Sequence, residues 1–299
     1  MEKLLKIKTR RYAAGASQYK RYTRSRVGNA FYFAFLLAAG AFSILPMIYC
    51  ICTSFKPLDE LLIFPPRFFV QRPTWENYLA LPNLLAKLRV PLSRYLFNSL
   101  FVSGVATALH VIAASMAAFA FSKSKLRCRM PLFLLVQFGL LYNAYTLAVP
   151  QYLIFSKLHM IDTYWVYIIP AIPSAMGAFL MKQYMDDSIP DALLEAGKIE
   201  GAGIFRIFWS IVMPIIKPAW MTLILFSFRD MWAIIPSGTI FSEELKTLPY
   251  VMSTITAGGL ARAGSAMAAT VILMIPPILV YMLSQRNVIE TMSSAGIKD

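Results

Sequence analysis

The chain has 299 residues, of which 58% are hydrophobic and only 15% are charged. Soluble globular domains average about 25% charged residues, so this composition excludes an ordinary soluble domain and indicates an integral membrane protein. The formal net charge of +14 could suggest a nucleic-acid partner, but the basic residues cluster beside long apolar runs. Because Lys and Arg flanking apolar spans set their orientation, the charge predicts membrane topology and no nucleic-acid partner.

The N-terminal segment, residues 1–27, carries nine Lys and Arg residues against Glu2 alone. The excess of cations predicts a basic tail that stays in the cytoplasm. The apolar run that follows is too long for the core of a signal peptide and lacks a small-residue cleavage site, so we expect it to be retained. The first membrane span is predicted at residues 29–53.

Residues 56–94 form a long segment interrupted by six prolines and rich in aromatic residues. Such a segment is typical of an extracytoplasmic loop with short amphipathic helices. Its six cations fit the positive-inside rule poorly, but long loops follow this rule less closely than short ones.

Five further apolar runs of near 20 residues predict five more spans. They lie at residues 95–121, 131–149, 164–182, 219–235 and 265–283. The third span is expected to close at Pro150, so that residues 151–163 cross the outer surface. Pro170 and Pro173 predict a kink in the fourth span, with freed carbonyls that neighbouring helices must satisfy.

The predicted fold is therefore an all-α integral membrane protein with about six transmembrane helices and both termini in the cytoplasm. The membrane domain is predicted at residues 28–285, and a cytoplasmic tail at residues 286–299. The basic block from Lys123 to Arg129 after the second span supports this orientation, because such dense positive charge belongs inside.

A cytoplasmic loop, residues 186–213, reads as a helix, a tight turn and a second helix. Ser188 and Asp191 have the spacing of a capping box, and Pro190 falls in the first turn. Gly201 permits a sharp reversal, because glycine takes a positive φ without a Cβ clash. Helical spacing then resumes and continues up to Pro214.

The residues of this hairpin carry a recognisable pattern. The pattern consists of Glu195, Ala196, Gly197, Glu200, Gly201, Ala202, Ile211 and Pro214. It resembles the cytoplasmic "EAA" loop of permease subunits in binding-protein-dependent ABC importers. Gly197 stands where that loop usually has a second Ala, and Glu200 where it usually has Asp. The resemblance implies a type I importer permease fold in which these residues form the contact to an ATPase.

Other stretches resemble the carbohydrate branch of the same permeases. They are the sequence PTWENY at residues 73–78, the pair Pro276 and Pro277 in the last span, and the ending Gly296-Ile297-Lys298. The resemblance implies a sugar or oligosaccharide solute and location in the bacterial cytoplasmic (inner) membrane. It also implies three partners: a second permease subunit, a cytoplasmic ATPase dimer that uses ATP and Mg²⁺, and an extracytoplasmic solute-binding protein. The spans, surrounded by membrane lipid, would rock between inward- and outward-facing states.

No motif for catalysis, nucleotide binding or metal binding is present in the sequence. There is no G-x-x-x-x-G-K-[ST] loop, so the chain itself is expected to hydrolyse no ATP and to bind no cofactor. Cys50, Cys52 and Cys128 show neither metal-ligand nor disulfide spacing. His110, inside the second span, is interpreted as an interhelical hydrogen-bonding residue. The chain is therefore predicted to be a transport subunit and not an enzyme.

Polar residues in the fifth span predict part of the solute pathway. Counted from Pro218, Arg229 lies about 16 Å along the helix, near the middle of a ~30 Å hydrocarbon core. Asp230 is adjacent, and because neighbouring helical residues point about 100° apart, we expect the two not to face each other. Trp232 and, in the third span, Tyr142, Asn143 and Tyr145 could add stacking faces and hydrogen bonds for a sugar. A guanidinium at this depth suits a carboxylate, which raises the hypothesis of an acidic oligosaccharide.

Two alternatives remain open from the sequence. One is an ABC permease for another solute, such as amino acids or peptides. The other, from a different class, is an ion- or proton-driven secondary transporter in which Asp230 is the coupling carboxylate. A membrane enzyme would need a catalytic constellation that the residues do not supply.

Overall fold

The computed structural model describes residues 26–86, 90–124, 127–141, 144–235, 238–259 and 262–295. Regular structure in these ranges is helical, with no strand among the described residues. Most of the predicted N-terminal tail, residues 1–25, lies outside them. The chain divides into two units, Met1–Tyr49 and Cys50–Asp299, and the first is represented by most of helix α2 (Arg26–Ser54).

Four described helices are long and apolar enough to cross a membrane, and two bent helix pairs raise the number to six if each pair is one span. The four are Val27–Ser54, Leu92–Lys123, Trp165–Ser188 and Ala263–Gln285. The bent pairs are Arg129–Leu141 with Thr146–Lys157, and Ile204–Ile215 with Lys217–Trp232. The all-α membrane fold with about six spans is confirmed.

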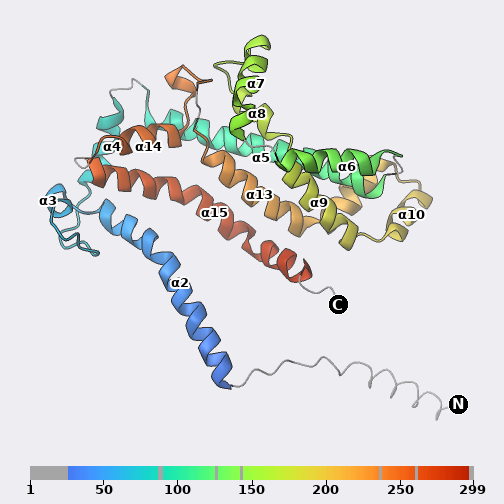
Figure 1. The fold of residues 1–299 in the computed structure, drawn as a ribbon, viewed down its shortest axis with the longest axis horizontal. Helices are drawn as coiled ribbons and strands as arrows, with labels where there is room; N and C mark the ends of the chain where they lie inside the picture. Colours follow the sequence, from blue (N-terminus) through green and yellow to red (C-terminus); the bar gives the residue numbers. More distant parts are fainter. Residues whose placement is uncertain are drawn as a thin grey trace. The chain divides into compact units, whose positions relative to one another are not determined.

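In the second unit α5 packs against α9 and α13, and α15 lies along α13 (Figure 1). In chain order its helices are α3 (Leu58–Leu61), α4 (Glu76–Ala86), α5 (Leu92–Lys123), α6 (Arg129–Phe138), η1 (Gly139–Leu141), α7 (Ala144–Lys157), α8 (Trp165–Ala171), α9 (Ala175–Ser188), α10 (Asp191–Ile199), α11 (Ile204–Ile207), η2 (Phe208–Val212), α12 (Met213–Ile215), α13 (Lys217–Trp232), η3 (Glu243–Leu245), α14 (Leu248–Thr256) and α15 (Ala263–Ala295).

Helix α5 contributes to three separate clusters of buried apolar side chains. Ala118 packs in an inner cluster with residues of α9, η2 and α13. Tyr95 belongs to an outer cluster with α14 and α15, and Val102 to a third cluster with α7 and α8. Because close-packed interiors transmit displacement, a movement of α5 would be felt in all three clusters.

One expected boundary, at the end of the third span, differs from the structure. Pro150 lies inside α7, which continues to Lys157, so the third apolar segment does not close at Pro150. Proline is tolerated there because the carbonyls it frees can be satisfied by neighbours in a membrane protein. Helix α15 continues unbroken to Ala295, although its span candidate ends at Gln285, so residues 286–295 of the predicted tail are helical.

The predicted kink in the fourth span is present between α8 and α9. Pro170 lies inside α8, and Pro173 falls in the break. His110 Nδ1 lies 2.8 Å from the carbonyl oxygen of Ala171, the last residue of α8, so the imidazole of α5 supplies a hydrogen bond at the point where the helix is interrupted. The prediction that His110 is an interhelical hydrogen-bonding residue is confirmed.

Candidate functional site

The turn of the hairpin in the segment 186–213 is formed by residues 197–202. Gly201 has φ +79°, its N–H donates to the Lys198 carbonyl at 3.0 Å, and the Ala202 N–H donates to the Gly197 carbonyl at 3.0 Å. These two bonds make a Schellman motif that closes α10 at Glu200. The predicted reversal at Gly201 is confirmed.

The beginning of α10 differs from the prediction. Ser188 is the last residue of α9, and the residue before α10 is Pro190, which has no side chain able to cap it. There is no capping box. Asp191 instead accepts a hydrogen bond from Lys123 Nζ at 2.9 Å, a partner 68 residues away that a local pattern cannot detect.

Gly197 explains how the two halves of the sequence pattern fit together. Its position is buried, and a Cβ built on it would lie 3.1 Å from Ile211 Cδ1 and 3.5 Å from Ile207 Cγ1. The isoleucine of the second half of the pattern therefore rests on the small residue of the first half. Glycine allows this close approach of α10 to the following helix.

The second arm of the hairpin is not a regular helix. It passes through a π-helical turn, Phe208–Val212, in which the Met213 N–H donates to the Phe208 carbonyl. Pro214, the expected end of this arm, lies one residue before its observed end at Ile215, and the chain bends by 80° before Lys217. A π turn locally interrupts the α-helical bonding pattern, as is common near functional sites.

The hairpin exposes a mixed apolar and acidic surface. Ile199 is 88% exposed and Phe205 69% exposed. Glu195 and Glu200 are exposed on the same short helix and at its end, as is Ala196. Large apolar side chains at a helix–turn–helix tip are typical of a surface that a partner covers.

Arg229 and Asp230, at the other end of α13, form an ion pair with 3.4 Å between Arg229 Nε and Asp230 Oδ1. The expectation that these neighbours do not face each other is wrong, because the long arginine side chain bends back to the carboxylate. Their side chains are 73% and 62% exposed, and Arg229 lies in the last turn of the helix. An exposed pair of this kind contributes little to stability, so both groups remain available to a further ligand.

The other predicted pathway residues are placed differently. Trp232 is buried, its indole N–H donates to the Leu273 carbonyl at 2.9 Å, and its ring stacks on Phe228 at 5.9 Å. That ring packs α13 against α15. Tyr142 and Asn143 lie outside the described residues, and Tyr145 is placed only as part of the α7 backbone.

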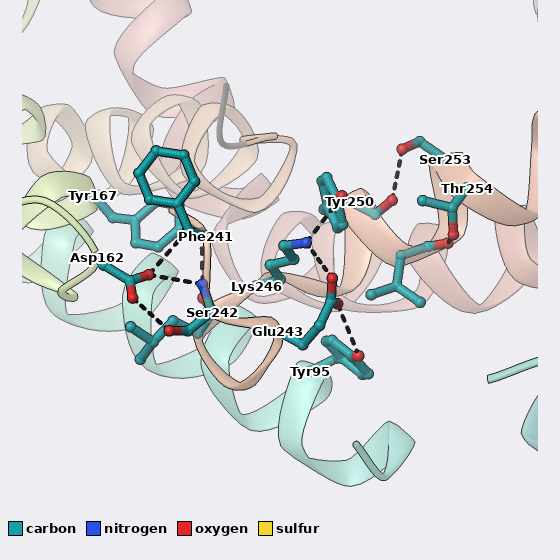
Figure 2. Close-up of polar contacts among 12 residues, drawn as sticks. Tyr95, Asp162, Tyr167, Phe241, Ser242, Glu243, Lys246, Tyr250, Ser253 and Thr254 are labelled. Atoms are coloured by element: carbon teal, nitrogen blue, oxygen red, sulfur yellow. Dashed lines mark hydrogen bonds and ion pairs between the residues drawn. The ribbon is translucent and has the colours of Figure 1, made fainter. Parts of the chain in front are cut away.

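A polar cluster on residues 238–250 was not predicted from the sequence (Figure 2). Asp162, with φ +61°, accepts hydrogen bonds from the Phe241 and Ser242 N–H groups, both at 2.9 Å, and from the Ser242 hydroxyl. The hydroxyl and amide donors of Ser242 lower the pKa of Asp162. The carboxylate therefore stays charged and holds residues 241–242 against the α7–α8 connection.

The same segment is fixed at its other end. Asn98 of α5 donates to the Glu244 carbonyl at 2.7 Å and to the Lys246 carbonyl at 2.9 Å. Lys246 pairs with Glu243 and donates to the Tyr250 hydroxyl at 3.1 Å. Burial alone would lower the pKa of Lys246, but the bonds to Glu243 and Tyr250 outweigh it and raise the pKa. Only the folded chain brings Asn98 and Asp162 to this segment, so no sequence signal identified the cluster.

The PTWENY stretch closes the end of α2 that lies in the second unit. Asn77 Nδ2 donates to the Ser54 carbonyl at 2.9 Å and to the Lys56 carbonyl at 2.7 Å. A Cβ built on Gly264, at the start of α15, would lie 2.4 Å from Asn77 Oδ1. The motif thus anchors the 56–94 segment between the end of α2 and the start of α15.

No group of three His, Cys, Asp or Glu side chains able to hold a metal ion is found among the described residues.

Comparisons with known proteins agree with this geometry. A family described as "Binding-protein-dependent transport system inner membrane component" matches residues 110–294. The polygalacturonan/rhamnogalacturonan transport system permease protein of Bacillus subtilis (strain 168) is 27% identical over 281 residues, covering 88% of this chain and 96% of that protein. The galactooligosaccharides transport system permease protein of the same organism is 27% identical over 276 residues, covering 89% and 95%.

The fold also matches a solved structure. A bacterial ABC transporter involved in the import of the acidic polysaccharide alginate contains a chain that superimposes with a TM-score of 0.73. The match has 21% sequence identity and covers 88% of this chain and 98% of that one.

Proposed function

The chain belongs to the family of inner membrane components of binding-protein-dependent transport systems, and on this basis we propose that it forms half of the translocation pathway of an ATP-driven oligosaccharide importer. The observation that carries the proposal is the hairpin: Gly201 at φ +79° in a Schellman turn, within the E-A-G…E-G-A…I-x-x-P pattern. Relatives named for polygalacturonan/rhamnogalacturonan and galactooligosaccharides support a carbohydrate solute over amino acids, peptides or an ion-coupled mechanism.

The proposal assigns the exposed hairpin to a cytoplasmic ATPase dimer. Ile199 and Phe205 would insert between ATPase side chains, with Glu195 and Glu200 supplying charge at the rim. Closure of the ATPase dimer on ATP would displace the hairpin, and α9 and α13 would carry the displacement into the membrane. A second permease subunit would complete the pathway, and a solute-binding protein would deliver the sugar from outside.

The solute is proposed to be acidic. The Arg229 guanidinium is largely exposed, and a planar fork of donors matches a carboxylate. One relative is named for polygalacturonan, whose sugar units are acids, and the matched structure is of an alginate importer. Asp230 occupies one edge of the guanidinium and leaves the remaining donors for a uronate group.

Replacing Arg229 by glutamine tests the solute. Arg229→Gln should reduce uptake of oligogalacturonate at least about tenfold, since a charge-assisted bond contributes about 1.5–3 kcal/mol, and should leave uptake of a neutral galactooligosaccharide within about twofold. Lys157→Gln, at an exposed lysine that ends α7 away from the hairpin, is the control for loss of one positive charge. An equal loss of uptake for both sugars would indicate a structural role for Arg229 and contradict the proposal of an acidic solute.

Cys128 tests the proposed orientation, in which the termini and residues 186–213 are cytoplasmic and residues 56–94 are outside. This thiol is exposed and immediately precedes α6. In intact cells a membrane-impermeant maleimide should leave Cys128 unlabelled, and in inverted vesicles it should label it. Labelling from outside would reverse the topology.

A further inference from the structure

The end of α5 reaches the joint at which the hairpin leaves α9. Lys123 is the last residue of α5, and its side chain is only 8% exposed. Its Nζ donates to the Ile189 carbonyl at 2.7 Å and to Asp191 Oδ1 at 2.9 Å. These two acceptors flank Pro190, so one ammonium group spans the connection between α9 and α10.

The ammonium and its carboxylate are matched in charge at neutral pH. The hydrogen bond and the positive charge of Lys123 lower the pKa of Asp191, which therefore stays ionised. A buried lysine held by two oxygen acceptors is restrained in both direction and distance. Apolar contacts of Ile189 and Leu194 also join this region to the inner cluster, but such contacts, unlike hydrogen bonds, are non-directional.

Further hydrogen bonds hold the end of α5 that carries Lys123. Ser122 donates to Asp186 of α9, and Lys182 donates to the same carboxylate at 2.6 Å. Arg129 donates to the Ser122 carbonyl at 3.2 Å, which ties the start of α6 to the end of α5. The ends of α5, α6 and α9 are therefore held together, and Lys123 extends from them to α10.

We propose that Lys123 is a positioning residue that latches α10 to α5, so that displacement of the hairpin moves α5 directly as well as through α9 and α13. The consequence follows from packing: α5 contributes to all three buried clusters and reaches the outer cluster through Tyr95. This inference rests on the proposed coupling function of the hairpin. It adds a third connection, which runs through a side chain and not through the backbone.

The test uses the complete importer, with its partner subunits, reconstituted in proteoliposomes. Solute uptake and ATP hydrolysis are measured together to give the number of ATP molecules consumed per solute. Lys123→Met keeps the apolar stem and removes the donors; we expect uptake per ATP to fall about tenfold while basal ATP hydrolysis persists. Lys123→Arg, which keeps the charge and donors, should restore most of the ratio. Lys157→Met is the matched control, an exposed lysine that also ends a helix.

Two further variants make the result decisive. Asp191→Ala removes the exposed acceptor and should lower uptake per ATP about threefold; this variant decides the question if Lys123→Met fails to assemble. Gly201→Val reports on the hairpin itself. If Gly201→Val lowers uptake per ATP and both latch variants leave it unchanged, the latch is overturned and the coupling hairpin stands. If Gly201→Val also has no effect, the proposed coupling function fails.

Discussion

Asp162, which binds the polar segment at residues 238–250, and Gly201, in the hairpin at residues 191–215, both have a positive φ. The surroundings of these two residues differ. The carboxylate of Asp162, at φ +61°, accepts hydrogen bonds from Phe241 and Ser242 of the same chain. Gly201 at φ +79° has no atom within 4 Å of the position that a Cβ would occupy, and the hairpin around it exposes Ile199 and Phe205. The polar segment has its hydrogen-bond partners within the chain, and the hairpin exposes apolar side chains.

This contrast shows where the chain is ordered by its own contacts. Residues 241–248 are bonded to α5 by Asn98 and Ser99, so their position is set before any partner binds. The hairpin is attached to the described helices mainly through Lys123 and the apolar side chains of its inner face. The polar segment is therefore held by contacts within the chain, whereas the hairpin leaves large apolar side chains exposed.

Disturbing the inner turn should have the largest effect. Gly201→Val forces a β-branched residue into a positive φ, which costs about 1–3 kcal/mol locally and disfavours the reversal. Solute uptake should collapse while membrane insertion survives, as measured by transport and by the amount of protein in the membrane. Gly203→Ala is the matched control, because Gly203 has φ −68° and open space around it. Normal uptake in Gly201→Val would contradict the assignment of the turn.

Disturbing the contact between Asn77 and Gly264 should destabilise the protein without altering the coupling of ATP hydrolysis to transport. Gly264→Ala places a Cβ 2.4 Å from Asn77 Oδ1, so either the amide or the helix must move. We expect a loss of about 1–3 kcal/mol in stability, seen as a lower thermal midpoint in detergent. Gly40→Ala, where no atom lies within 4 Å, should leave the midpoint near that of the wild type. Equal midpoints for the two variants would show that the contact at Gly264 relaxes freely.

Releasing the polar segment at residues 238–250 should have a smaller effect on the protein, confined to that segment. Asp162→Ala removes the acceptor for three donors and leaves a non-glycine residue in the left-handed region, which together should cost about 2 kcal/mol. Hydrogen exchange of the amides at residues 241–248 should quicken, while that of α10 stays unchanged. Asp162→Asn keeps one oxygen acceptor and tolerates the positive φ, so its exchange rates should lie between those of the wild type and Asp162→Ala.

Acidity should have the smallest effect on either region. The pKa values of Asp162 and Asp191 are both lowered from 3.8 by the hydrogen bonds that these groups accept. A depressed pKa adds stability that is complete above the unfolded value and is lost only as the pH falls through the folded value. Thermal midpoints between about pH 5 and pH 8 should therefore show no transition from these carboxylates. A transition near pH 6 that Asp162→Asn abolishes would refute this.

Features under local chemical control could be predicted from the order of residues alone. A run of apolar residues as long as a bilayer is thick must be helical in a membrane, because its backbone has no other partner there. The turn at Gly201 involves only the residues from Gly197 to Ala202, so it could be predicted from the local sequence. The need of the broken fourth span for a donor was also foreseeable, and His110 was a candidate in a neighbouring span.

Which distant groups meet depended on the folded arrangement of the helices. Lys123 with Asp191, Asp162 with Ser242, and Trp232 with the Leu273 carbonyl are separated by 68, 80 and 41 residues. The predicted Ser188 capping box is absent because Ser188 belongs to α9 and Pro190 precedes α10. Even the adjacent Arg229 and Asp230 met through a side-chain conformation that helix geometry leaves free. A hydrogen bond depends on distance and direction in space, and the order of residues along the chain constrains these only across a turn or two of helix.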